Sequence, residues 1–283
     1  MGLALGSAGG RLAYRLLARR RRIALANMEL VRAAGFLPPD FPARTTARAV
    51  FANHGRGAWE IIRLYHRGLA PFRADCRLAE GGEHMSRALA ESRDSGRGLL
   101  ILTGHIGNWE LMCHFTAEFF GFRLNIVGRR TGDPLTDALA GRLRSTNGNR
   151  FLDKDGSARN MLAVLRSGGV LGTLIDQAIL TESPNSTTLT PFMGCEATFN
   201  LGPLRLARRA GAAIILTLFR REGRTHFLHV LPPLPPAPER PEAEDHKAKA
   251  GQINAWLGEF IRRYPDQWLW GHRRWKAGRR KDN

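Results

Sequence analysis

Cysteine is scarce in this chain, and the three cysteines lie far apart. Cys76, Cys113 and Cys195 show none of the paired spacing that disulfide frameworks or cysteine-ligated zinc sites require. We therefore expect three buried small side chains in a protein of a reducing compartment. The chain also has no recognisable metal-ligand or cofactor motif, so we predict neither a metal nor a cofactor.

Long apolar runs are missing as well. A helix that spans a bilayer needs about 18 or more consecutive apolar residues, and the longest candidates, such as GAAIILTLF at 211–219, have the length of a strand. The N-terminal apolar segment contains Arg11 and Arg15 and has no basic region before it, which argues against a signal peptide. The sequence therefore predicts a protein that does not span the membrane.

Acidic residues are few: 25 Asp and Glu stand against 43 Lys and Arg, which gives a formal net charge of +18 at pH 7. A surface of this sign attracts nucleic acid, anionic lipid or an acidic protein. The chain has no zinc finger, no aromatic ribonucleoprotein motif and no basic helix with heptads, so we expect no nucleic-acid partner. The G-x-S-x-G, P-loop and H-E-x-x-H motifs are absent too, which argues against a serine hydrolase, a P-loop protein and a zincin.

Two patterns follow one another along the chain. Residues 11–70 have helical periodicity interrupted by the turn-forming segment GFLPPDFP, and from about residue 97 short apolar runs alternate with helical segments. Strands that alternate with helices indicate an α/β fold with a mixed, largely parallel sheet flanked by helices. We expect an N-terminal helical part at the membrane surface over residues 1–75. An α/β domain over 76–283 should include a last helix that stops before Pro265 and a basic, aromatic tail.

The segment LLILTGHIGNWELM at 99–112 places polar residues between two apolar stretches. Residues 99–102 predict a buried strand that ends in a glycine turn, and Asn108 is a good N-cap for a following helix. His105 then lies in the turn and Glu110 in the first helical turn, where the two side chains can meet. A surface or capping contact explains the same spacing, so the pair alone does not establish a catalytic site.

Five ordered segments, of which the first is the polar centre of this stretch, together carry a more specific signal. In order along the chain they are GHIGNWE (104–110), VGRRTGDPLTDALAGRLRS (127–145), SARNMLAVLRSGGVLGTLIDQ (157–177), PFMGCEATFNLGPLRLARRAGAAII (191–215) and YPDQWLWGHRRWK (264–276). Together they resemble the lipid A biosynthesis acyltransferase family of lauroyl and myristoyl transferases, which is related to the phosphatidylinositol mannoside acyltransferases. The resemblance covers about the last two thirds of the chain. It implies a glycerolipid-acyltransferase-like α/β fold at a membrane, and transfer of a fatty acyl group from a thioester to a hydroxyl.

The H-x4-[DE] motif of that family corresponds to His105 and Glu110 in this sequence. A hydroxyl needs a base when it attacks a thioester carbonyl, and a neutral imidazole suits this task. A carboxylate on the other ring nitrogen fixes the tautomer and stabilises the imidazolium that forms. We therefore expect His105 to be the general base and Glu110 to orient it.

The resemblance also implies an arginine and a strand-end aspartate in the site. The matching segments, GRLRS and LIDQ, indicate Arg144 first and Arg142 second as the group that stabilises the oxyanion, with Asp176 orienting the arginine or a water. A solvent-facing Arg142 and a loop-capping Asp176 are the simpler alternatives. The expected catalytic residues are thus His105, Glu110, Arg144 and Asp176, and the expected substrate-binding residues are Arg142, Asn108 and Gln177.

Two segments are expected to face an anionic membrane surface. The N-terminal one combines four arginines at 19–22 with Leu12, Leu16, Leu17 and Ile23, as in a basic interfacial helix, although a helix packed on its own domain has the same pattern. The C-terminal one combines aromatic and cationic side chains that suit an interface, with at least one tryptophan expected in the core: Trp268, Trp270, Arg273, Arg274, Trp275 and Lys276. The predicted location is peripheral, on the cytoplasmic face of the inner membrane.

The donor and the acceptor stay open on the sequence alone. An acyl carrier protein or acyl-coenzyme A fits as the thioester donor, and a lipid A-like molecule or a related glycolipid fits as the acceptor. Other acceptors are a lysophospholipid, an amino-acid lipid or a pigment alcohol. A non-catalytic basic protein that binds lipid or nucleic acid is the alternative of a different class.

Overall fold

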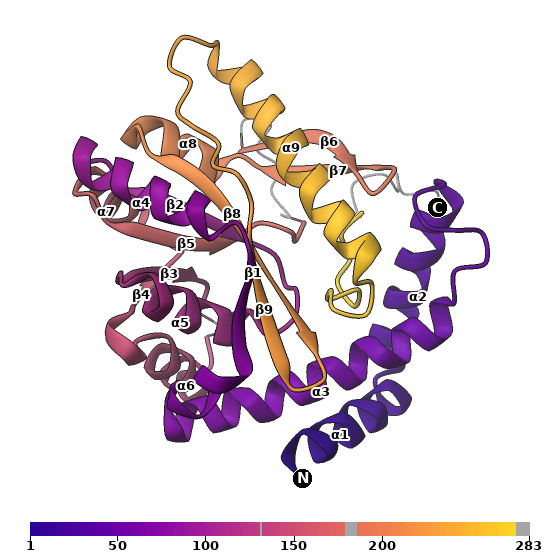
Figure 1. Cartoon of the computed structure of the whole chain (residues 1–283). Helices are drawn as coiled ribbons and strands as arrows, with labels where there is room; N and C mark the ends of the chain where they lie inside the picture. The colour runs from indigo at the N-terminus through magenta and orange to yellow at the C-terminus, as the bar shows by residue number, and fades with distance from the viewer. Residues whose placement is uncertain (131, 179–185, 276–283) are drawn as a thin grey trace.

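The N-terminal part of the protein is helical. The computed structural model describes residues 1–130, 132–178 and 186–275. Three helices come first, α1 (Gly2–Leu16), α2 (Ala18–Ala33) and α3 (Ala43–Arg67), followed by the short 3-10 helix η1 (Ala70–Asp75). The proline-rich segment separates α2 from α3 as predicted, and α1 lies alongside the long helix α3 (Figure 1).

A seven-stranded sheet forms the centre of the fold, in the order β1-β9-β8-β2-β5-β3-β4. Neighbouring strands are parallel except for the antiparallel pair β8 and β9, so the predicted mixed, largely parallel sheet is confirmed. A separate antiparallel hairpin, β6 (Thr187–Phe192) with β7 (Cys195–Asn200), was not predicted. The sheet strands are β1 (Cys76–Glu80), β2 (Leu99–Thr103), β3 (Leu124–Gly128), β4 (Arg150–Asp153), β5 (Val170–Leu174), β8 (Ala213–Glu222) and β9 (Thr225–Val230).

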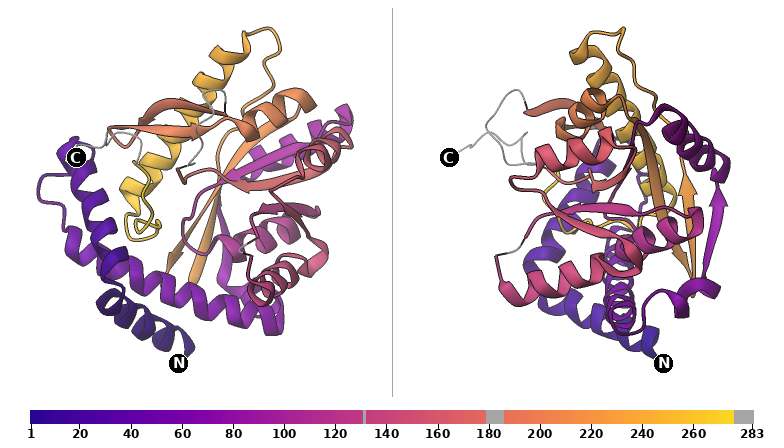
Figure 2. Two further views of the ribbon diagram at one scale, coloured as in Figure 1. Left: turned by 180° about the vertical axis from the view of Figure 1, so that it is seen from behind. Right: turned by 90° about the vertical axis from the view of Figure 1, so that its left-hand side faces the viewer.

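Helices cover both faces of this sheet (Figures 1 and 2). Successive side chains of β2 alternate between two apolar clusters, because strand residues point to opposite faces in turn: Leu100 and Leu102 belong to one cluster, and Leu99 and Ile101 to the other. The remaining helices are α4 (Gly82–Ser95), α5 (Trp109–Phe120), α6 (Pro134–Arg144), the 3-10 helix η2 (Thr146–Gly148), α7 (Ala158–Arg166), α8 (Gly202–Ala210) and α9 (Glu242–Arg263). The last of them stops before Pro265, as predicted.

The segment after α9 folds back into the protein. Trp268, Trp270 and Arg274 are only 1%, 0% and 1% exposed, so the prediction of a membrane-facing position is wrong for these three residues. The expectation that at least one tryptophan lies in the core is confirmed. Trp268 pairs as an isolated bridge with Ile106, and the N–H of Leu269 donates to the carbonyl of His105 at 3.0 Å. The segment that contains Trp268 therefore packs directly against the 104–110 turn. Of the other residues predicted to face the membrane here, Lys276 lies outside the described residues.

Within the described part of the chain, no helix combines the length and the apolar character needed to cross a bilayer.

Candidate active site

Two polar residues meet where strands β2 and β5 end. The strands pair in parallel with Thr103 opposite Leu174, so the residues two positions later, His105 and Asp176, lie at the same height above the sheet edge. Nδ1 of His105 is 2.7 Å from Oδ1 of Asp176, and the His105 backbone N–H donates to Oδ2 at 2.8 Å. Two residues 71 positions apart thus form the centre of the site.

Asp176 is held as a buried carboxylate. It is 2% exposed, and besides His105 it accepts a hydrogen bond from the indole N–H of Trp268 at 2.7 Å. Burial alone would raise the pKa of Asp176, but the charge and the hydrogen bonds of His105, together with Trp268, lower it to about 2. The group is therefore ionised at neutral pH and can stabilise a positive charge on the imidazole.

The other ring nitrogen of His105 faces Gln177. The side-chain amide N–H of Gln177 donates to Nε2 at 3.1 Å, which leaves the Nδ1–H to donate to Asp176. The side chain of His105 is 16% exposed, and its ring lies edge-on to Trp109 with ring centroids 4.9 Å apart. The ring nitrogen that does not contact Asp176 is therefore directed toward Gln177.

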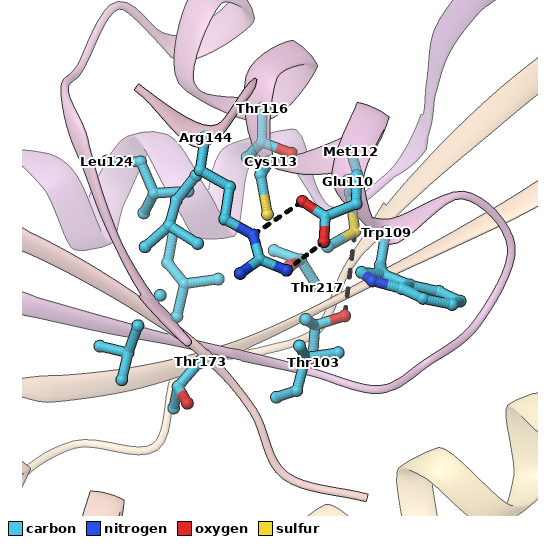
Figure 3. Close-up of a pocket in the computed structure, with 15 residues that line it drawn as sticks. Thr103, Trp109, Glu110, Met112, Cys113, Thr116, Leu124, Arg144, Thr173 and Thr217 are labelled. Atoms are coloured by element: carbon cyan, nitrogen blue, oxygen red, sulfur yellow. Dashed lines mark hydrogen bonds and ion pairs between the residues drawn. The ribbon is translucent and has the colours of Figure 1, made fainter. Parts of the chain in front are cut away.

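Glu110 does not orient His105, contrary to the prediction. Its two oxygens accept hydrogen bonds from Nε and Nη2 of Arg144, at 3.1 and 2.5 Å (Figure 3). The physical reason is position: Glu110 lies in the first turn of α5 and points toward Arg144 at the end of α6, whereas His105 turns toward the end of β5. Among the described residues, the hydrogen-bond partners of Asp176 are His105 and Trp268 and not Arg144 or Arg142, so the structure does not support the predicted orientation of an arginine. The predicted orientation of a water stays a prediction.

The Arg144–Glu110 pair lies over a small, mainly apolar cavity of about 30 Å³ (Figure 3). Burial alone would lower the pKa of Arg144, but its hydrogen bonds and charge interaction with Glu110 outweigh that effect and raise it. Cys113 lines the same cavity, and burial raises the pKa of its thiol to about 12. A thiol of that pKa stays protonated at neutral pH and is a poor nucleophile.

Two predicted substrate-binding residues have structural partners. Arg142 is exposed on α6, with its guanidinium 5.1 Å from the ring centre of Tyr65 and donating to the Tyr65 hydroxyl at 3.3 Å. Asn108 caps α5 as predicted, accepting from the backbone N–H of Leu111 at 3.1 Å. Both side-chain groups of Asn108 are occupied, because its amide N–H donates to Glu60 at 2.8 Å.

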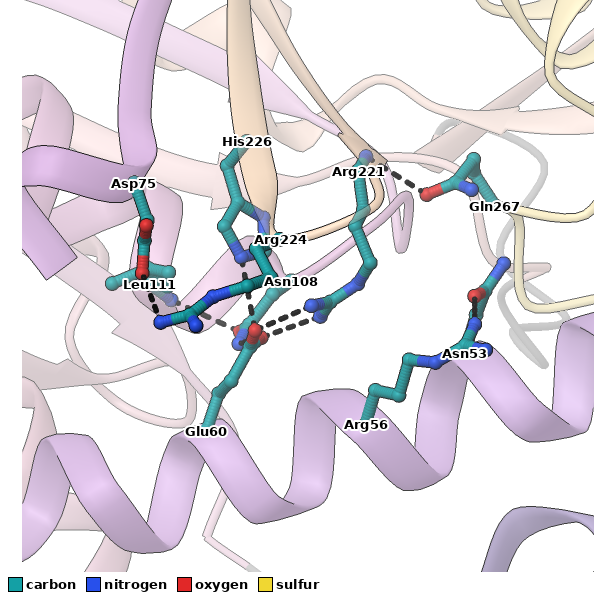
Figure 4. Close-up of polar contacts among 10 residues, drawn as sticks. All are labelled: Asn53, Arg56, Glu60, Asp75, Asn108, Leu111, Arg221, Arg224, His226 and Gln267. Atoms are coloured by element: carbon teal, nitrogen blue, oxygen red, sulfur yellow. Dashed lines mark hydrogen bonds and ion pairs between the residues drawn. The ribbon is translucent and has the colours of Figure 1, made fainter. Parts of the chain in front are cut away.

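A buried ionic cluster around Glu60 supports this cap and was not predicted. Glu60 of α3 is 4% exposed and binds Arg221 of β8 through two hydrogen bonds, while His226 of β9 lies 3.0 Å away (Figure 4). Burial alone would raise the pKa of Glu60, but hydrogen bonds from His226 and Arg221 lower it to about 2. The residues come from three separate elements and share no sequence motif, so no signal in the sequence marks them as partners.

The described residues include no group of three or more His, Cys, Asp or Glu side chains placed to hold a metal ion. The three cysteines are unpaired; Cys76 is buried and the other two are partly buried.

Comparison with known proteins decides the family. A sequence model described as bacterial lipid A biosynthesis acyltransferase matches residues 3–277. The chain belongs to this family. It is also 30% identical over 288 residues to the lipid A biosynthesis lauroyltransferase of Escherichia coli (strain K12), with 96% of this chain and 84% of that protein covered. Membership in the lipid A biosynthesis acyltransferase family makes the chain an acyltransferase, and the matched range contains every site residue described above.

Proposed function

We propose that this protein transfers a fatty acyl group from a thioester donor to a hydroxyl of a lipid A-like acceptor or a related glycolipid. The family supports the acyl transfer, and the name of the lauroyltransferase relative supports the class of acceptor. The observation that carries the proposal is the chain of hydrogen bonds that joins Asp176, His105 and Gln177 where strands β2 and β5 end.

In this proposal His105 is the general base. The acceptor hydroxyl takes the place of the Gln177 amide at Nε2, gives its proton to this nitrogen, and its oxygen attacks the thioester carbonyl carbon. The buried carboxylate of Asp176 stabilises the imidazolium through Nδ1. When the tetrahedral intermediate collapses, the carbon–sulfur bond breaks and the imidazolium returns the proton to the leaving thiolate. Donor and acceptor leave as a free thiol and an ester.

The developing oxyanion needs hydrogen-bond donors. Arg144 keeps its catalytic role in the proposal: Glu110 occupies two of its three guanidinium nitrogens, and Nη1 has no hydrogen-bond partner in the described part of the chain. Glu110 becomes the group that positions this arginine. The first backbone N–H groups of α5 add a positive dipole end beside the 104–110 turn.

The proposed partners follow from charge and from exposed apolar residues. An acyl carrier protein or acyl-coenzyme A supplies the thioester, and both are anionic, as suits a chain of net charge +18. The proposed location is peripheral, at the cytoplasmic face of the inner membrane. Leu12, Leu16 and Leu17 support it, because these large apolar side chains in the C-terminal half of α1 and directly after it are 54%, 70% and 50% exposed.

The experiment is an acyl-transfer assay with purified protein, a lauroyl thioester and a set of acceptors. These are a lipid A precursor with a free hydroxyl, a lysophospholipid, an ornithine lipid and a pigment alcohol. We expect ester formation on the lipid A precursor and a loss of at least about 10²-fold in His105→Ala, the size typical of a lost general base. His84→Ala, which changes a histidine of α4, is the matched control. Transfer to another acceptor alone would reassign the substrate. No transfer at all, with lipid binding intact, would favour a non-catalytic binding protein.

A further inference from the structure

Helices α1 and α3 pack against each other through glycine. A Cβ atom added at Gly6 would lie 2.6 Å from the carbonyl oxygen of Gly55, and one added at Gly10 would lie 2.1 Å from that of Phe51. The two backbones are therefore in direct contact, and the helices run side by side in Figure 1 and in the left view of Figure 2. Because glycine has no side chain, these positions leave the space beside the helix contact unfilled.

An open groove of about 850 Å³ runs along this helix pair. That volume lies in the range of pockets that hold ligands. Its walls are mostly apolar, with Leu5 on α1, Leu17 between α1 and α2, Phe51 and Ile62 on α3, and Leu269 from the segment after α9. The groove is distinct from the small cavity beneath Arg144 and Glu110, since the two share no lining residue.

One end of the groove reaches the candidate catalytic histidine. Gln177 lines the groove and is the residue that donates to Nε2 of His105. His54 lines it as well, and its Nε2 is buried without a hydrogen-bond partner among the described residues. Burial and the charge of His105 lower the pKa of His54 to about 4, so it stays a neutral ring at physiological pH. A ligand in the groove would thus have its polar end beside His105.

The rim of the groove exposes apolar surface next to positive charge. Leu5, Leu17 and Ile62 are 58%, 50% and 52% exposed, and the outward arginines Arg19, Arg20 and Arg22 follow α1 directly. Exposed apolar side chains grouped on neighbouring helices mark a binding surface more often than scattered ones do. Apolar residues beside arginines suit the interface of an anionic bilayer.

We infer that the α1/α3 groove holds an acyl chain of the acceptor lipid and delivers its hydroxyl to His105. The inference rests on the proposed function, because it assigns the acceptor of that reaction. We assign the groove to the acceptor and not to the donor because a membrane lipid can enter it across the exposed apolar rim. A thioester on a carrier protein or on coenzyme A arrives from water.

Gly9 offers a direct test of occupancy. It lines the groove, and a Cβ atom added there would meet nothing within 4 Å, so Gly9→Phe places a ring in the groove without disturbing the contact of α1 with α3. Its neighbour Ala8 is also exposed but does not line the groove, so Ala8→Phe is the matched control. Circular dichroism and thermal unfolding establish that both variants keep the fold.

The first readout is binding without turnover. A lipid A precursor that carries a photoreactive diazirine at the end of one acyl chain is irradiated with the His105→Ala protein in detergent micelles, and the crosslinked peptides are identified by mass spectrometry. We expect crosslinks on α1 and α3, reduced about tenfold by Gly9→Phe and unchanged by Ala8→Phe. Crosslinks elsewhere, or the same yield with Gly9→Phe, would overturn the inference even if the protein transfers acyl groups.

The second readout separates acceptor from donor in the active protein. Gly9→Phe should raise the KM for the lipid acceptor about tenfold and leave the KM for the lauroyl thioester within about twofold. A rise in the KM for the thioester alone would assign the groove to the donor chain and overturn the inference. If no transfer occurs but the groove crosslinks disappear in Gly9→Phe, the groove is a lipid site and the proposed function fails instead.

Discussion

The carboxylate of Asp176 contacts both the ring and the backbone of His105, at 2.7 and 2.8 Å. This double contact fixes the turn after β2 to the end of β5, so the direction of Nε2 is set by two adjacent strands of the sheet. Trp268 closes the far side of the carboxylate with a third hydrogen bond at 2.7 Å. A base held in this way needs little reorganisation when it takes up a proton.

Replacing Asp176 by Asn should therefore impair chemistry more than binding. An amide can donate to Nδ1 and move the ring proton to Nε2, where it blocks proton uptake. We expect kcat to fall by roughly 10²- to 10⁴-fold with KM for both substrates within a few-fold. Asp94→Asn, an exposed change on α4, is the control. Full activity of a folded Asp176→Asn protein would remove Asp176 from the mechanism.

Arg144 and Arg142 lie two residues apart on one helix, but replacing each of them should have very different effects on stability and on kcat. Arg144→Ala leaves the mostly buried Glu110 without its partner, so we expect the free energy of unfolding to drop by about 2–3 kcal/mol. As a proposed oxyanion donor its loss should also lower kcat by about 10²-fold. Arg142→Ala, an exposed position, should change stability by no more than about 0.5 kcal/mol. Equal effects of the two substitutions on kcat would contradict the assignment.

Glu60 should make stability sensitive to acid. Its pKa is lowered in the folded protein to about 2 from an ordinary value of 4.5, so its contribution is complete above pH 4.5 and is lost as the pH falls toward 2. That shift corresponds to on the order of 3 kcal/mol of unfolding free energy. Glu60→Gln should lower stability at pH 7, because Arg221 then stays buried without a counter-charge, and should flatten the pH dependence between 4.5 and 2. Urea unfolding of both proteins across this range measures the difference; parallel curves would refute the prediction.

Salt should separate the two possible donors. An acyl carrier protein is acidic and large, so a chain of net charge +18 attracts it over a distance that shrinks as the Debye length falls from about 10 Å at 0.1 M salt to about 3 Å at 1 M. We expect the carrier-protein thioester to react faster than the coenzyme A thioester at low salt, with the preference narrowing as salt rises. Initial rates with lauroyl donors of each kind measure this. A constant preference for coenzyme A would exclude the carrier protein as the favoured donor.

Membrane attachment should depend on the apolar end of α1. Leu16→Glu removes an apolar side chain that is 70% exposed and should weaken binding to vesicles with anionic lipid by about tenfold. Leu135→Glu on α6 changes a side chain of nearly the same exposure, 69%, and is the control. Co-sedimentation with vesicles gives both affinities, and equal losses would show that α1 has no special part in attachment.

The local pattern of the sequence determined much of the fold. Apolar runs bounded by glycine specify β2, β3, β5 and β8, and the proline-rich segment ends α2, because these signals act over a few neighbouring residues. Asn108 caps α5 for the same reason. The short strands β1 and β4 and the β6–β7 hairpin escaped prediction, since brief partly exposed segments form strands only beside a partner.

Tertiary structure alone decided which carboxylate contacts His105. Glu110 is five residues away in sequence, yet the helix directs it to Arg144, while Asp176 is brought to the ring by the parallel register of β2 and β5. Strand order and register depend on the packing of the whole sheet, which no short motif encodes. The same holds for the C-terminal tryptophans, whose composition suits a membrane interface but whose burial follows from the bridge between Trp268 and Ile106.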